Sequence, residues 1–73
     1  MARTFPEAAL EKLLKRGGAP RVSLGAKEAL RKELETLGGR VAAEAARLAA
    51  HAGRRTVDES DIRLAFRFIA QSA

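Results

Sequence analysis

Cysteine, tryptophan and tyrosine are absent from this chain of 73 residues, and histidine occurs once, at His51. Without cysteine there are no disulfides and no thiolate metal ligands, and a single histidine argues against the usual zinc site. A chain of this size gains about 3–5 kcal/mol from its own core, so small domains rely on a disulfide, a metal or a partner. With the first two excluded and no cofactor expected, the sequence predicts an oligomer.

Long apolar runs are missing as well. No stretch approaches the ~20 apolar residues of a membrane span, and no signal-peptide core is present, so we expect a cytoplasmic protein. The sequence also lacks a nucleophile with a paired base, a phosphate-binding glycine loop and paired carboxylates. We read Gly17-Gly18 as a helix stop, and we do not expect an enzyme.

Positive charge is what the chain has in excess. The chain contains fourteen Lys and Arg residues and nine Asp and Glu residues, which gives a net charge of +5. Such a balance in a small domain favours nucleic acid or another anionic surface as partner. A basic surface that serves only solubility is the alternative at this point.

A first helix is predicted over residues 5–16, with apolar residues at helical spacing. Thr4 can accept a hydrogen bond from the amide of Glu7, and Pro6 suits a first turn. Gly17 and Gly18 supply the left-handed backbone that ends a helix.

A long amphipathic helix is predicted over residues 24–52, capped by Ser23 and closed by Gly53. Gly38-Gly39 in its middle indicates either a break or a close crossing of two backbones. Because the apolar spacing continues in phase on both sides of the pair, we favour the crossing.

A third helix is predicted over residues 59–70 behind the cap Asp58. The chain is therefore expected to be one all-α domain over residues 1–73, with extended loops between a short, a long and a short helix. One long helix with two short ones cannot cover its own apolar stripe, whereas two chains with crossed long helices can. Packing alone thus predicts a dimer.

The order of elements from Thr4 to Ile69 resembles the histone fold. Arg21-Val22-Ser23 and the segment from His51 to Thr56 are similar to the two loop signatures of the tail-less archaeal histones. The resemblance implies an obligate handshake homodimer that binds double-stranded DNA without reading its sequence, compacts it, and is associated with the chromosome in the nucleoid.

The resemblance also implies roles for individual residues. Arg21 would enter the minor groove near Thr56 of the partner chain, Arg55 would approach phosphate, and Arg54 would pair with Asp61 to fix the second loop. Lys12 and Lys15 match phosphate-contacting positions, although a merely solvated face of the first helix is the alternative. The full expected DNA-binding set is Lys12, Lys15, Arg21, Val22, Ser23, Lys27, Arg55 and Thr56.

Archaeal histone dimers join through a four-helix bundle, and its contacts resemble Leu48, His51, Asp61 and Leu64 here. These residues predict tetramers or a polymer on DNA, with His51 of one dimer bonded to Asp61 of another. A lone histidine near a helix end is otherwise a surface residue. Asp58 and Glu59 depart from the family pattern, because they put acid where a basic residue is common.

Two other functions compete with a DNA-packaging homodimer. A histone-fold subunit of a heterodimeric transcription factor would need a different partner chain. A membrane-surface helix would carry aromatic residues opposite a basic face. The long helix has no aromatic residue, and glutamates such as Glu28 and Glu44 interrupt its basic face.

Overall fold

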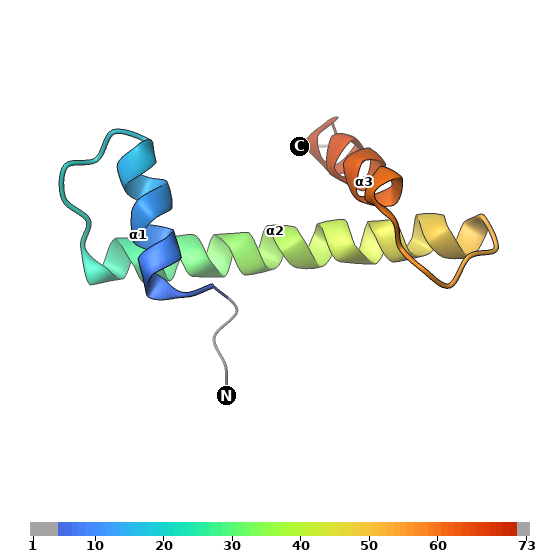
Figure 1. Cartoon of the computed structure of the whole chain (residues 1–73), viewed down its shortest axis with the longest axis horizontal. Helices are drawn as coiled ribbons and strands as arrows, with labels where there is room; N and C mark the ends of the chain where they lie inside the picture. The colour runs from blue at the N-terminus through green and yellow to red at the C-terminus, as the bar shows by residue number, and fades with distance from the viewer. Residues whose placement is uncertain (1–4, 72–73) are drawn as a thin grey trace. The chain divides into compact units, whose positions relative to one another are not determined.

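The computed structural model describes residues 5–71, which form three helices and no strand (Figure 1). Helix α1 spans Glu7–Arg16, α2 spans Leu24–His51 and α3 spans Glu59–Gln71. The expected all-α order of a short, a long and a short helix is confirmed. None of the described helices is long and apolar enough to cross a membrane.

Helix α1 begins at Glu7, two residues later than its spacing predicted. Phe5 precedes a proline, and the proline ring disfavours helical backbone at the residue before it. Pro6 is the N-cap, with an extended ψ of 143° and no side-chain cap. Thr4, the predicted cap, lies outside the described residues.

At the end of α1, only one of the two glycines is left-handed. Gly17 has a right-handed φ of −74°, whereas Gly18 has a φ of 110°. The expectation that both are left-handed is wrong, because one such residue is enough to turn the chain out of a helix. Gly18 is therefore the position that requires glycine.

Helix α2 is capped at both ends as predicted. The Ser23 hydroxyl accepts a hydrogen bond from the amide of Ala26 at 3.0 Å. Gly53 has a φ of 76°, and the amides of Gly53 and Arg54 donate to the carbonyls of Ala50 and Ala49, both at 2.9 Å. This pair of bonds is a Schellman motif.

The glycine pair in the middle of α2 does not break the helix. The break considered as an alternative is therefore wrong. A Cβ atom placed on Gly38 or on Gly39 would meet nothing within 4 Å. No part of the described chain makes the close approach that the pair predicts.

The chain divides into two compact units, Met1–Thr36 and Leu37–Ala73. In the first, α1 packs on the start of α2, with Leu10 1% exposed. The second unit joins α3 to the end of α2 around a small core (Figure 1). Its buried residues are Val41, Ala45, Ala65 and Ile69, with Leu37 and Leu48 packed against them.

Many larger apolar side chains are exposed in the single chain. The exposed fractions range from 40% at Val57 to 63% at Leu24. The others are Leu13, Ile62, Leu64, Phe66 and Phe68. Exposed apolar area of this extent is unfavourable in water and is typical of a surface that binds a partner.

Candidate nucleic-acid interface

The first loop delivers Arg21 and Val22 to the start of α2. Ser23 caps this helix, and its first turn contains no acidic residue, in contrast to α3, which has Glu59 and Asp61 there. The amino end of a helix attracts anions through its free amides and its dipole. Among residues 5–71, the exposed side chain of Arg21 has no hydrogen-bond or ion-pair partner. This end of α2 is therefore an electropositive surface without a neutralising carboxylate in its first turn.

The second loop is held by Arg54 and Asp61. Nη1 of Arg54 donates to Oδ2 of Asp61 and Nη2 donates to Oδ1, each at 2.9 Å. Nη1 also reaches the carbonyl of Thr56 at 3.0 Å. These bonds link the end of α2 to the start of α3 and leave Arg55 and Thr56 exposed between them.

Asp61 also completes a reciprocal cap with Asp58. Oδ1 of Asp58 accepts from the amide of Asp61 at 3.2 Å, while Oδ2 of Asp61 accepts from the amide of Asp58 at 3.0 Å. Such a capping box satisfies two amides at a helix start. The hydrogen bonds from the Arg54 guanidinium, and then the one from the Asp58 amide, hold the pKa of Asp61 far below its ordinary value. Asp61 is therefore ionised and fixed at neutral pH.

The three lysines of the expected DNA surface differ in their surroundings. Nζ of Lys27 lies 3.1 Å from Glu11 and 3.6 Å from Glu7, and Glu11 also pairs with Lys15 at 3.2 Å. Bonds to Lys27 and Lys15 lower the pKa of Glu11, and the bond to Glu11 raises the pKa of Lys27. Lys12 is exposed and has no side-chain partner in the described part of the chain.

The residues expected to join dimers lie in the second unit. His51 and Leu64 are exposed, and Leu48 is half-buried against the core. Asp61, in contrast, is only 5% exposed, and both of its carboxylate oxygens accept hydrogen bonds from Arg54. Its Oδ1 accepts a bond from Nη2 of Arg54, and a carboxylate oxygen has a second lone pair that can accept from a further donor.

Comparison with known proteins decides the family. Residues 3–66 match the family described as histone-like transcription factor (CBF/NF-Y) and archaeal histone. The chain belongs to this family. Over 61 residues, 84% of this chain and 91% of the relative, it is 43% identical to one of the subunits of archaeal histone HAN1 from Thermococcus zilligii. The three helices are thus those of a histone fold, and the expectation that the chain is not an enzyme is confirmed by its membership in a histone family.

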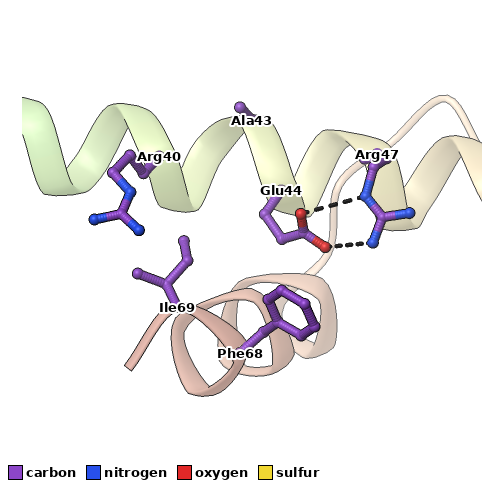
Figure 2. Close-up of a pocket in the computed structure, with 6 residues that line it drawn as sticks. All are labelled: Arg40, Ala43, Glu44, Arg47, Phe68 and Ile69. Carbon is purple, nitrogen blue, oxygen red and sulfur yellow. Dashed lines mark hydrogen bonds and ion pairs between the residues drawn. The ribbon is translucent and has the colours of Figure 1, made fainter. Parts of the chain in front are cut away.

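Sequence reasoning missed two features of this histone-family chain. Arg31 is 6% exposed and donates from Nε and Nη2 to the carbonyl of Phe5, at 3.4 and 3.3 Å, and also contacts Glu28. Neither charge spacing nor hydropathy signals a bond across 26 residues. The other feature is a cavity of about 410 Å³ in the second unit (Figure 2). Its lining residues are Arg40, Ala43, Glu44, Arg47, Phe68 and Ile69.

Proposed function

We propose that two copies of this histone-family chain form a handshake dimer that binds double-stranded DNA without reading its sequence, and that successive dimers compact the DNA. The observation that carries the proposal is the exposed Arg21 beside the amino end of α2, whose first turn contains no acidic residue of its own. Backbone amides, a helix dipole and a long cation suit phosphates and a narrow groove, and none of them distinguishes one base from another.

Dimerisation is supported by the exposed apolar residues and by the open backbone at Gly38 and Gly39. Two α2 helices that cross at this pair would bring their backbones together and bury the apolar faces of both chains. We propose one histone-fold domain per chain over residues 1–73, completed by the partner.

The proposed DNA surface combines the two loops with the face of α1. Arg21 enters the minor groove, Val22 and Ser23 present the amino end of α2, and Arg55 and Thr56 meet phosphate from the second loop. Lys12 and Lys15 extend the surface along α1. Lys27 belongs to the same surface, but Glu7 and Glu11 already offset its charge, so its contribution is the smallest of the set.

We further propose that dimers join into tetramers or a polymer on DNA through Leu48, His51, Asp61 and Leu64. The exposed positions of His51 and Leu64 support this assembly. His51 would donate to the remaining lone pair of Asp61 Oδ1 in the opposing dimer. In the cell, the assembly would be associated with the chromosome in the cytoplasm.

A heterodimer is the second candidate, and the comparisons favour it on one specific point. The Thermococcus relative is by its name one of the subunits of its histone, and the family includes transcription factors. Sedimentation of the purified chain by itself separates the two candidates. A folded dimer supports self-pairing, whereas an unfolded monomer that folds only with a second histone-fold chain supports the heterodimer.

Duplex binding as a function of salt tests the DNA role. Two duplexes of equal length and unrelated sequence are titrated between about 50 and 200 mM salt. We expect closely similar affinities and a linear fall of log K with log salt of about 0.9 per neutralised phosphate. An affinity that ignores salt, or anionic vesicles bound more tightly than duplex, would contradict the proposal.

A further inference from the structure

Four charged side chains contact one another where α1 packs on the start of α2. Glu7, Glu11 and Lys15 are spaced four residues apart, so they follow one side of α1. Nζ of Lys27, from the start of α2, lies 3.1 Å from Oε1 of Glu11 and 3.6 Å from Oε1 of Glu7. We call these four residues the α1 charge cluster. Its two carboxylates and two ammonium groups carry no net charge.

Glu11 is the centre of the α1 charge cluster, because its two carboxylate oxygens contact two different lysines. Oε1 accepts a hydrogen bond from Lys27, and Oε2 lies 3.2 Å from Nζ of Lys15. The bonds from Lys27 and Lys15 lower the pKa of Glu11, so its carboxylate is ionised at neutral pH. The side chains of Glu11 and Lys15 are 42% and 50% exposed, whereas that of Lys27 is 13% exposed. A phosphate that approaches either lysine therefore meets the negative charge of Glu11 as well.

We propose that Glu11 competes with the phosphates of DNA for Lys15 and Lys27, and that it thereby limits how tightly the face of α1 binds a duplex. This inference rests on the proposed DNA surface and adds to it a residue that weakens binding. Lys12 follows Glu11 directly, is exposed and has no side-chain partner in the described part of the chain. The charge of Lys12 is therefore available to the duplex, in contrast to the charges of Lys15 and Lys27.

The competition follows from the way in which cations of a protein bind DNA. Each phosphate that such a cation neutralises releases a condensed counterion and adds about 0.9 to the slope of log K against log salt. A lysine that keeps its carboxylate brings no net charge to the phosphate, so the counterion stays on the DNA. A lysine that leaves its carboxylate loses an ion pair in exchange for the new one. In both cases Lys15 and Lys27 contribute less to binding than an unpaired lysine does.

A role of Glu11 that is confined to holding α1 on α2 is the alternative. Helix α1 has other attachments to α2, because Leu10 is 1% exposed and Nε and Nη2 of Arg31 both donate to the carbonyl of Phe5. Exposed ion pairs add little to the stability of a fold. We therefore expect α1 to stay in place without the charge of Glu11. A purely structural role predicts no gain in DNA affinity when that charge is removed.

The first test compares two variants that change the net charge equally. Glu11→Gln removes the central carboxylate, and Glu33→Gln removes an exposed carboxylate of α2 that has no side-chain partner among residues 5–71. Fluorescence anisotropy measures the duplex affinity of both variants and of the wild type between about 50 and 200 mM salt.

We expect Glu11→Gln to bind duplex more tightly than the wild type and to steepen the salt slope by about 0.9. Its gain in affinity should then be about 3.5-fold larger at 50 mM than at 200 mM salt. Glu33→Gln should leave the slope nearly unchanged, because its charge is not paired with a lysine of the proposed DNA surface.

A second comparison does not depend on the folding of Glu11→Gln. Lys12→Gln and Lys15→Gln remove equal charges from exposed positions of α1. We expect Lys12→Gln to reduce the salt slope by about 0.9 and Lys15→Gln to reduce it by less than half as much. When each is combined with Glu11→Gln, the two lysine variants should reduce the slope equally.

The outcomes separate this inference from the DNA role itself. Equal slopes for Glu11→Gln and Glu33→Gln would overturn the competition and leave duplex binding standing. Equal slopes for Lys12→Gln and Lys15→Gln in the presence of Glu11 would do the same. A wild-type affinity that does not depend on salt would overturn both this inference and the proposed function.

Discussion

Arg54 donates a hydrogen bond to each carboxylate oxygen of Asp61, with Nη1–Oδ2 and Nη2–Oδ1 distances of 2.9 Å each. The pair joins the end of α2 to the first turn of α3, seven residues later in the chain. Asp61 also caps α3 through the amide of Asp58. These bonds fix the two ends of the second loop, and Arg55 and Thr56 lie exposed between them.

The Asp61 carboxylate should contribute to stability in a pH-dependent way. Replacing it in Asp61→Asn puts amide hydrogens against Arg54 and the Asp58 amide, so we expect Tm at pH 7 to fall by several degrees. The pKa of Asp61 is depressed in the folded state, from an ordinary 3.8. Its contribution is thus complete above about pH 4–5 and is lost as the pH falls toward the folded pKa.

Thermal melts of both proteins from neutral to strongly acidic pH check this prediction. The Tm difference between wild type and Asp61→Asn should stay constant down to about pH 5 and narrow below about pH 4. Glu11 and Glu44 also have lowered pKa values, but both proteins share them, so their effect cancels in the difference. A difference that remains constant through the acidic range would contradict the role assigned to Asp61.

The loop arginines should set the salt dependence of DNA binding. Arg21→Ala and Arg55→Ala should each weaken duplex binding equally for all sequences and reduce the log–log salt slope by about 0.9 per lost phosphate contact. Arg67→Ala, which removes the same charge from the polar back of α3, is the control and should alter the slope far less. Fluorescence anisotropy at several salt concentrations measures all three. Equal effects of Arg21→Ala and Arg67→Ala on the salt slope would show that binding depends on the net charge of the protein and not on the loop arginines.

The glycine pair of α2 should be required for dimerisation. In a lone helix, Gly→Ala is stabilising by about 0.5–1 kcal/mol, and neither Gly38 nor Gly39 has a neighbour within 4 Å that a Cβ would meet. We nevertheless expect Gly38→Ala and Gly39→Ala to raise the dimer dissociation constant, because the added methyl groups separate the crossed helices. Gly25→Ala, where a Cβ would lie 3.9 Å from Ser23 Oγ, is the control. If Gly38→Ala and Gly39→Ala instead lowered the dimer dissociation constant, the two α2 helices would not cross at this glycine pair.

His51 and Leu48 should affect assembly rather than DNA binding. We expect His51→Ala and Leu48→Ala to retain the affinity of a dimer for a short duplex and to shorten the footprint on a long one. Binding to duplexes of two lengths, followed by nuclease protection, separates these effects. An unchanged footprint in both variants would remove the proposed contact between dimers.

Local chemistry explains what the sequence predicted well. Side-chain caps such as Ser23 and Asp58 and the left-handed Gly53 act within a few residues of themselves, so their sequence context was sufficient. The family match likewise followed from the two loop segments. The start of α1 differed by two residues because the effect of Pro6 on Phe5 outweighs the helical spacing that follows.

Contacts between residues far apart in the chain could not be predicted from the sequence. Lys27 meets Glu11 across 16 residues, and Arg31 meets the Phe5 carbonyl across 26, because α1 folds back on the start of α2. A lysine near a helix start predicts a phosphate contact only if no carboxylate reaches it first. Phe66 of α3 is 52% exposed in the single chain, which its residue type alone does not indicate.

Nuclease digestion of the protein on long DNA tests the central claim most directly. A histone whose dimers wrap DNA and join side by side should protect a ladder of fragments that grow by a constant increment, one for each added dimer. The same ladder should appear on DNA of unrelated sequence. A smear without protected fragments, at protein concentrations that saturate the DNA, would contradict the account.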